Sequence, residues 1–231
     1  MFFIDKWYGK IVVSGNIVEL HKYEKLNVNG GGARDGDGRD RDHNYSQSQR
    51  RRRNTIRQLI CSNFDCNSKF VTLTFRDDMP FDIHNVKACN KFFMRFVLRV
   101  RYRFPDFKYV AVIEFQDKNG RGAVHYHMIC NLPYVKKAEL CSLWSGGFVK
   151  INAIDKVDNV GAYVIKYMTS DMDDKRLMDL NAYLHSHGLK KPVEVTTWRD
   201  SDSEAFQEIY DSLKSETPSY SQQYESDNAG H

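Results

Sequence analysis

Two histidines separated by one residue, His125 and His127, follow a glutamate, Glu114, across a segment that is typical of a β-hairpin. Apolar, β-branched runs lie on both sides of Asn119-Gly120, which is the strongest kind of short-range hairpin signal. Pairing the strands around this two-residue turn places position 114 opposite 125 and position 112 opposite 127. Because side chains alternate between the faces of a strand, Glu114, His125 and His127 are predicted on one face of one sheet.

Two imidazoles and a carboxylate on a common face suit a divalent metal ion and leave positions open for a substrate. A lone His-x-His on a strand is more often a packing feature, and the carboxylate on the same face is what favours a metal site here. The prediction depends on the hairpin register, since a β-bulge would shift one strand against the other. Tyr126 is expected on the opposite face, under helices.

A second cluster lies further along the chain, where Tyr163, Lys166 and Tyr167 occupy positions i, i+3 and i+4 of a predicted helix and share a face. Tyrosine is a poor nucleophile at neutral pH because its pKa is about 10. A neighbouring ammonium group favours the phenolate, a metal ion can polarise the phosphorus that it attacks, and Lys166 can neutralise developing phosphate charge. The alternative is that both tyrosines are half-buried packing residues, and the nearby metal-ligand set favours chemistry.

The elements that must position these residues follow from hydrophobic periodicity. A strand at 69–75 carries Thr72 and Thr74 on one face, where they either bind a phosphate or ligand or serve as ordinary strand residues. The order of elements is typical of an α+β fold whose central strands are antiparallel, with helices on one face and the other face free for a site. The remaining predicted elements are a hairpin at 10–26, helices at 84–104, 136–144, 155–172 and 174–186, a hairpin at 109–129, and a strand at 148–151.

The charge distribution is uneven along the 231 residues, a length that suggests one domain with extensions or two small ones. Residues 200–231 contain one lysine and eight acidic residues, a net charge of −7, so residues 1–199 carry +11 of the total +4. A basic body with an acidic tail indicates a polyanionic partner, most simply nucleic acid, although ordinary solubility charge is the alternative. The run Arg50–Arg53 and the basic residues of helix 84–104 are either phosphate-binding surfaces or solvated faces.

The other sequence features bound the class of protein. Five scattered cysteines imply no disulfide framework, and Cys61 and Cys66 lack a second pair to complete a zinc site, so a structural role in a reducing compartment is expected. No apolar run approaches the ~20 residues needed to span a membrane, and Asp5 and Lys6 interrupt the apolar start, so a cytoplasmic location is predicted. Residues 27–55 are predicted to be a disordered Gly-, Asp- and Arg-rich linker.

Three segments together resemble motifs I, II and III of the rolling-circle replication initiators of the HUH endonuclease superfamily. They are Phe70-Val71-Thr72-Leu73-Thr74-Phe75, His125-Tyr126-His127 and Tyr163-Val164-Ile165-Lys166-Tyr167. The resemblance covers about 65–185, and the two tyrosines that flank a lysine are similar to the third motif of initiators from small single-stranded DNA phages and related bacterial plasmids. One departure is the low-complexity segment at 27–50, which is not a feature expected of the family.

The resemblance implies a ferredoxin- or RRM-like sheet of about five antiparallel strands with helices packed on it. It implies Mg²⁺ or Mn²⁺ held by His125, His127 and an upstream acid that maps to Glu114. It implies Tyr163 as the nucleophile, with Tyr167 either a second nucleophile or structural. The domain boundaries expected from it are N-terminal strands at 1–26, the linker at 27–55, the endonuclease domain at 56–200 and an acidic polar tail at 201–231.

The function expected from these residues is site-specific nicking and rejoining of single-stranded origin DNA, which starts rolling-circle replication through a 5′-phosphotyrosyl intermediate. No phosphate-binding G-x4-G-K-[ST] loop occurs, so a host helicase and DNA polymerase are expected partners. Three alternatives stay open: a relaxase or transposase with the same chemistry, a non-catalytic RRM-like nucleic-acid-binding protein, and a metal hydrolase that uses activated water. The sequence leaves the origin sequence, the type of element and the oligomeric state undetermined.

Overall fold

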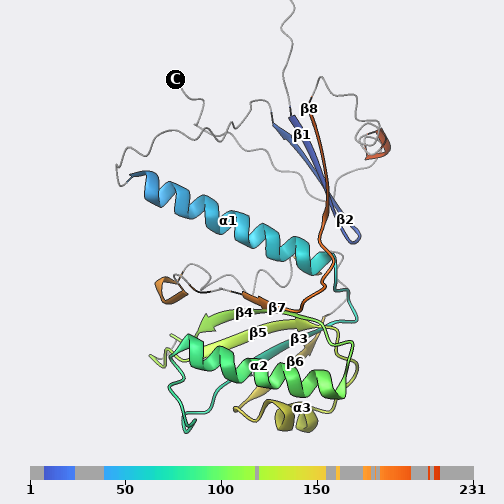
Figure 1. The fold of residues 1–231 in the computed structure, drawn as a ribbon. Helices are drawn as coiled ribbons and strands as arrows, with labels where there is room; N and C mark the ends of the chain where they lie inside the picture. The colour runs from blue at the N-terminus through green and yellow to red at the C-terminus, as the bar shows by residue number, and fades with distance from the viewer. Residues whose placement is uncertain are drawn as a thin grey trace, which may run out of the picture. The chain divides into compact units, whose positions relative to one another are not determined.

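The computed structural model describes residues 8–23, 39–117, 120–154, 160–161, 174–177, 180, 183–198, 208 and 211–213. The chain forms two compact units, of which one contains a three-stranded sheet and the other contains the elements from α1 to β7. Figure 1 shows the elements, and each unit is described by itself below.

A five-stranded antiparallel sheet forms the centre of the larger unit, in the order β6-β3-β5-β4-β7, which confirms the predicted α+β class. Its strands are β3 (Lys69–Thr74), β4 (Tyr109–Phe115), β5 (Val124–Cys130), β6 (Val149–Ala153) and β7 (Tyr183–His185). The two central strands, β4 and β5, form the predicted hairpin, and β5 lies between β4 and β3. The middle strand of the sheet therefore carries both histidines.

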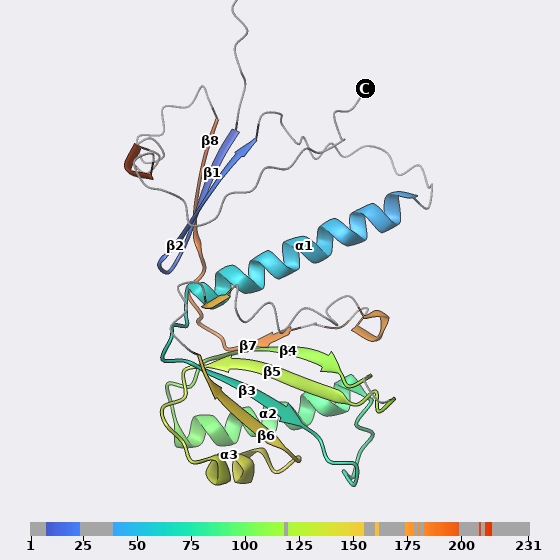
Figure 2. The same cartoon turned by 180° about the vertical axis from the view of Figure 1, so that it is seen from behind.

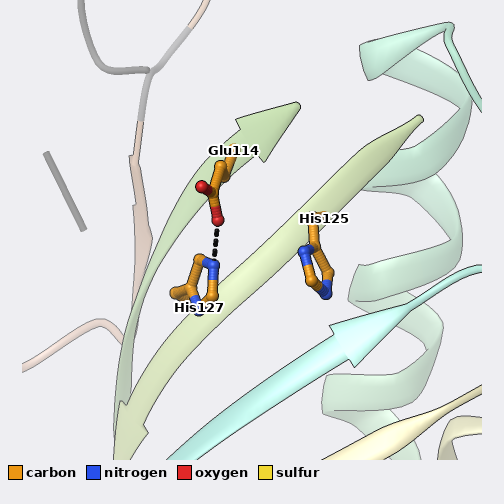
Figure 3. Close-up of side chains that lie close together, drawn as sticks. All are labelled: Glu114, His125 and His127. Carbon is orange, nitrogen blue, oxygen red and sulfur yellow. Dashed lines mark hydrogen bonds and ion pairs between the residues drawn. The ribbon is translucent and has the colours of Figure 1, made fainter. Parts of the chain in front are cut away.

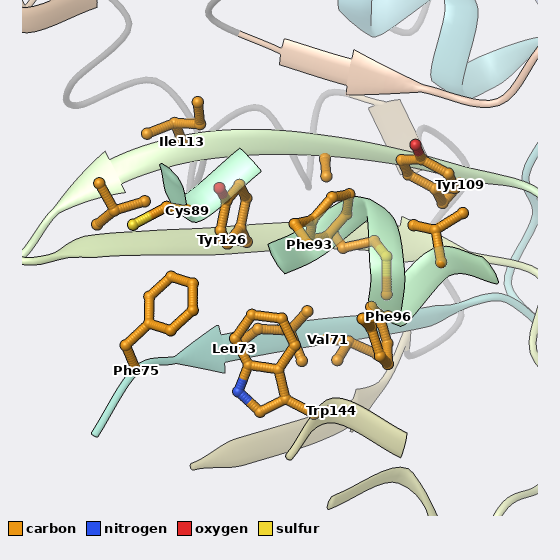
Figure 4. Packing of buried hydrophobic residues seen from close by; sticks show 14 of the residues in the cluster. Val71, Leu73, Phe75, Cys89, Phe93, Phe96, Tyr109, Ile113, Tyr126 and Trp144 are labelled. Atoms are coloured by element: carbon orange, nitrogen blue, oxygen red, sulfur yellow. The ribbon is translucent and has the colours of Figure 1, made fainter. Parts of the chain in front are cut away.

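Helices α2 (Val86–Arg103) and α3 (Lys137–Trp144) cover one face of this sheet. The Asn85 side chain caps α2 by accepting a hydrogen bond from the amide of Ala88, as a short polar residue at a helix start commonly does. The apolar stripe predicted for this helix is buried, and Tyr126 stacks on Phe93 in the core with ring centroids 4.5 Å apart. Figure 4 shows this packing, which places Tyr126 under the helices as predicted.

Helix α1 (Arg39–Cys61) covers part of the opposite face, as both views of the fold show (Figures 1 and 2). Its apolar residues Ile56, Leu59 and Ile60 pack in one cluster with the side chains that this face presents at one end of the sheet, namely Phe70, Val110, Val112 and Ile129. Burial of these apolar side chains holds the helix in place. The same face carries Thr72, Thr74, Glu114, His125 and His127 toward the other end, so it is apolar under α1 and polar beyond it.

Two predictions about secondary structure are wrong. The linker predicted over 27–55 is helical from residue 39 onward, because the polar, arginine-rich sequence continues into the apolar turn that anchors α1 on the sheet. The helix predicted over 174–186 is replaced by a short 3₁₀ helix, η1 (Lys175–Leu177), and by β7. Strand β7 adds to the free edge of β4, and this pairing overrides the helix-like spacing of the leucines.

The smaller unit contains a sheet of β1 (Tyr8–Ser14), β2 (Ile17–Tyr23) and β8 (Val193–Trp198), in the order β2-β1-β8. The hairpin predicted around Ser14-Gly15-Asn16 is present. Strand β8 was not predicted, and its pairing with β1 places 193–198 with the N-terminal hairpin instead of with the predicted endonuclease segment 56–200. Across the described residues, the search for a helix long and apolar enough to cross a membrane finds none.

Candidate metal centre

The hairpin of β4 and β5 has the register that its sequence predicts, with Glu114 opposite His125 and Val112 opposite His127. The three polar side chains therefore point to the same face of the sheet, and Figure 3 shows them close together above β4 and β5. One ligand atom from each of Glu114, His125 and His127 can be chosen so that all three lie within 4.8 Å of one another. A cation with bonds of about 2.1 Å holds neighbouring ligand atoms about 3 Å apart, so small side-chain shifts suffice to bind one.

The closest contact in this cluster joins a carboxylate oxygen of Glu114 to Nε2 of His127. The exposed fractions of the two side chains are 29% for Glu114 and 14% for His127, so solvent and a substrate can reach the group although most of it is covered. Phe70 stacks on the imidazole of His127 with ring centroids 5.7 Å apart, on the side that α1 covers. The cluster thus lies where the apolar half of this face ends.

Two threonines of β3 hold the histidines from the neighbouring strand. The Thr74 hydroxyl lies 2.5 Å from Nε2 of His125, and the Thr72 hydroxyl lies 3.3 Å from Nδ1 of His127. Direct cross-strand pairing of Thr74 with His125 and of Thr72 with His127 produces both contacts. Metal-binding histidines commonly use their second ring nitrogen in such a bond, which fixes the orientation of the ring. With Nε2 of His125 bound to Thr74, its Nδ1 is the nitrogen that can face a cation.

Replacing Thr74 with valine should therefore weaken Mn²⁺ binding by about tenfold, because the imidazole of His125 loses the bond that orients it. The Thr74→Ser variant keeps the hydroxyl and should bind Mn²⁺ as the wild type does. Calorimetric titration of the three proteins with Mn²⁺ measures this difference. Equal affinities for wild type and Thr74→Val would show that the hydroxyl does not support the site.

His125 is prepared for metal binding by its surroundings. Burial lowers its pKa from the ordinary 6.5 to about 4, and the nearby His127 adds to this effect, while Glu114 acts in the opposite direction. The imidazole of His125 is therefore neutral at physiological pH, which is the form that binds metal ions. A cation does not have to displace a proton from this residue.

The same lowered pKa predicts how the stability of the metal-free protein depends on pH. Between pH 6.5 and 4 the unfolded chain takes up a proton on His125 and the folded chain does not, so the free energy of unfolding falls as the pH is lowered through this range. A pKa difference of this size corresponds to at most about 3 kcal/mol. Urea unfolding in the presence of a chelator should show this loss, and His125→Gln should lack it. Identical pH profiles for the two proteins would contradict the burial of a neutral imidazole.

Arg121, in the connection between β4 and β5, fastens the tip of the hairpin to the end of β3. Its guanidinium donates to the carbonyl of Phe75 at 2.6 Å, to Asp77 at 2.7 Å and 3.0 Å, and to the side chain of Gln116. The backbone carbonyl of Arg121 in turn accepts a hydrogen bond from His84. That bond, followed by one to Asp82, raises the pKa of His84. The sequence gives no signal for this network, because its members are distant along the chain.

The basic residues of α2 are on the other side of the sheet from the histidines, because this helix packs against the face that carries Val71 and Tyr126. Arg99 donates to the carbonyls of Leu143 and Trp144, and so ties α2 to the end of α3. The basic surface of α2 is therefore not part of the metal centre. Of the cysteine pair expected to be structural, Cys61 is buried and Cys66 is exposed.

Tyr163, Lys166 and Tyr167 lie outside the described residues, so their predicted positions are not tested. The two described residues before them, Val160 and Gly161, are helical. Val160 is buried in the cluster that anchors α1. A Cβ atom on Gly161 would lie 2.6 Å from the backbone oxygen of Arg57 and 2.5 Å from the sulfur of Cys61, so only glycine fits there. The segment that contains the tyrosines therefore starts from a point that is tightly packed on α1.

Comparison with known proteins adds one finding. Residues 68–172, just under half of the chain, match the model of the replication-associated protein family of the ORF2 type. This range contains the metal cluster and the tyrosine motif, and it starts one residue before β3. No match was found among curated proteins or among solved structures. Residues 68–172 are therefore a domain of this replication-associated protein family, which confirms the predicted resemblance to a rolling-circle replication initiator.

Proposed function

We propose that this protein nicks and rejoins single-stranded DNA at a specific site by a tyrosine transesterification, and that the nick initiates rolling-circle replication of a plasmid or phage. One observation carries the proposal: a domain of a replication-associated family brings Glu114, His125 and His127 together on the open end of its central sheet. The replication role follows from the family, and the chemistry is the proposed part.

The three side chains fit a divalent cation. They offer one carboxylate oxygen and two imidazole nitrogens, a mixed donor set that Mn²⁺ and Mg²⁺ accept alongside water or phosphate oxygens. Glu114, His125 and His127 would hold the ion, which would polarise the scissile phosphodiester and favour attack on its phosphorus. The threonines of β3 keep the imidazoles in place before substrate arrives.

Tyr163 is the proposed nucleophile. Its phenolic oxygen forms a bond to phosphorus while the bond from phosphorus to the 3′ oxygen breaks, and that oxygen leaves as a 3′-hydroxyl after taking up a proton. The product is a 5′-phosphotyrosyl link, and the free 3′-hydroxyl primes DNA synthesis. Lys166 favours the phenolate and offsets charge on the phosphate oxygens. Attack by a 3′-hydroxyl on the phosphotyrosine reverses the reaction without ATP, and Tyr167 is the candidate for a second such transfer.

The basic charge of residues 1–199 suits binding of the strand, because lysine and arginine side chains displace counterions from phosphates. A host helicase would have to open the duplex, since the sequence contains no nucleotide-binding loop of its own. A host DNA polymerase would extend the new 3′ end.

A covalent adduct is the test of this proposal. The protein is incubated with Mn²⁺ and a labelled single-stranded oligonucleotide that contains the origin, and the products are separated on a denaturing gel. We expect a labelled band that migrates with the protein and that a chelator abolishes. Cleavage with turnover and without any adduct would instead support the metal hydrolase that uses activated water.

The remaining alternatives differ in what they predict. A relaxase or transposase would form the same adduct on a transfer site or a transposon end, so the choice of oligonucleotide separates them from an initiator. A non-catalytic RRM-like binder stacks bases on exposed aromatic residues of the sheet. On the face that carries the histidines, Phe70 is only 7% exposed because it packs in the α1 cluster, which does not favour such a surface.

A further inference from the structure

We propose that Arg176 is a positioning residue, which fastens the chain that follows the tyrosine segment to the end of the strand that carries Glu114. This inference rests on the proposed function, because it assigns Arg176 a role in presenting Tyr163 and Tyr167 to the metal centre. Arg176 lies outside the segment that matches the replication-associated family, so the match does not assign it.

Arg176 binds two carboxylates and one aromatic ring at once. Its Nη1 and Nη2 donate to the two carboxylate oxygens of Asp117 at 2.9 Å and 2.5 Å, in the bidentate arrangement that gives arginine–carboxylate pairs their geometric specificity. Its Nε and Nη2 donate to Asp174 at 2.9 Å and 2.5 Å. The guanidinium carbon lies 3.7 Å from the centre of the Phe115 ring, close enough for a cation–π contact.

The partners of Arg176 connect two parts of the proposed active centre. Phe115 is the last residue of β4 and directly follows Glu114, and Asp117 comes two residues later. Asp174 is the first described residue after the stretch 162–173, which contains both tyrosines and Lys166. One guanidinium therefore joins the strand end of a metal ligand to the chain end of the tyrosine segment.

Apolar packing keeps Arg176 where it is. The next residue, Leu177, is buried in the core between the sheet and α2, and its amide donates to the carbonyl of Asp174 at 2.9 Å. A few residues later, β7 pairs with β4. The backbone on both sides of the guanidinium is thus fixed to the same strand that carries Glu114.

The opposite end of the tyrosine segment is also anchored, because Gly161 packs against Arg57 and Cys61 of α1. Twelve residues, 162–173, connect the two anchors, and such a stretch could span up to roughly 40 Å if only one end were held. Holding both ends greatly reduces the positions that a side chain within it can adopt. A misplacement of about 1 Å is enough to slow a reaction by up to about a hundredfold.

A purely structural role would have a different signature. The exposed fractions of the side chains of Arg176, Asp117 and Asp174 are 40%, 58% and 20%, and ion pairs that solvent reaches in this way contribute little to stability. Hydrogen bonds from Arg176 lower the pKa of both carboxyl groups, so the network stays charged throughout the neutral range. Loss of Arg176 is therefore expected to affect the reaction more than the melting temperature.

The test compares single-turnover adduct formation by wild type, Arg176→Ala and Arg176→Lys. We expect Arg176→Ala to lower the rate by about tenfold to a hundredfold, with Mn²⁺ affinity and melting temperature close to wild type. Arg176→Lys keeps the charge but cannot bind Asp117 in a bidentate manner, so its rate should be intermediate. Arg103→Ala is the matched control, since it breaks another exposed arginine–carboxylate pair, with Glu139, away from the metal centre, and should react like the wild type.

Hydrogen exchange of peptides that cover 162–173 provides a readout that does not depend on activity. Exchange in these peptides should be faster in Arg176→Ala than in wild type or Arg103→Ala. Wild-type exchange in Arg176→Ala would overturn the inference, whether or not the rate falls. If no adduct forms with any protein but exchange still increases, the proposed chemistry fails and the anchoring role stands. Should Arg176→Ala fold poorly, Asp117→Asn breaks the same bidentate pair and must give the same two results.

Discussion

Replacing Tyr163 with phenylalanine should abolish the covalent protein–DNA adduct, with a loss of at least about three orders of magnitude in its rate of formation. The substitution removes one oxygen atom, which is the atom proposed to bond to phosphorus, and leaves the ring in place. Metal binding should be unaffected, because the ligand atoms belong to Glu114, His125 and His127 on a separate hairpin. The measurement is the denaturing gel with Mn²⁺ and labelled origin oligonucleotide, together with a Mn²⁺ titration.

Tyr167→Phe is the matched control for this experiment, because the two tyrosines share one helix face in the predicted arrangement. If Tyr167 is a second nucleophile, its variant still forms the first adduct and loses only the transfer of a strand from one tyrosine to the other. Lys166→Ala should slow adduct formation without abolishing it. A full yield of adduct from Tyr163→Phe would show that Tyr163 is not the nucleophile.

Replacing His127 with alanine should remove divalent-ion binding and DNA cleavage together. His127 touches Glu114 directly, and its second nitrogen is bound to Thr72, so its imidazole is in the middle of the polar cluster. Loss of a bond to a ligand from the surrounding residues costs 10- to 100-fold in metal affinity, and loss of the ligand itself should cost at least about a hundredfold. Calorimetric titration with Mn²⁺ and the adduct assay measure the two effects in the same preparation.

An exposed histidine outside the cluster provides the control. His187 lies in the turn that follows β7 and belongs to no group of metal-binding side chains among the described residues, so His187→Ala should bind Mn²⁺ and form adduct normally. Glu114→Gln should behave like His127→Ala, because an amide oxygen replaces the carboxylate. Divalent-ion-dependent cleavage at the wild-type rate by His127→Ala would rule out the metal centre as described.

The metal cluster could be predicted from the sequence because local rules determine it. The apolar runs on both sides of Asn119-Gly120 fix which residues face each other, and strict alternation then decides the face. The register found for β4 and β5 is the predicted one, even though the strands end at Phe115 and Val124 and leave a longer connection than a two-residue turn. The contact of Thr74 with His125 needed the pairing of β3 with β5, which no local pattern reveals.

The errors arise where long-range pairing competes with local spacing. Leu177, Leu180 and Leu184 have helix-like spacing, but the free edge of β4 recruits this segment as a strand. The arginine-rich start of α1 has no apolar periodicity of its own, and only its last turns, from Ile56 on, are buried on the sheet. Strand β8 was missed although Val193-Glu194-Val195-Thr196 alternates as a strand does. For Arg176 the sequence offers no signal, because Asp117 is 59 residues away.

Diffraction from crystals soaked in Mn²⁺, recorded where manganese scatters anomalously, tests most directly whether one cation is held by these three side chains. We predict a single strong peak about 2.0–2.3 Å from a carboxylate oxygen of Glu114 and from one nitrogen each of His125 and His127. The His127→Ala protein should give no peak at this position. A wild-type crystal in which manganese binds elsewhere, with the contact between Glu114 and His127 intact, would contradict the proposed metal centre.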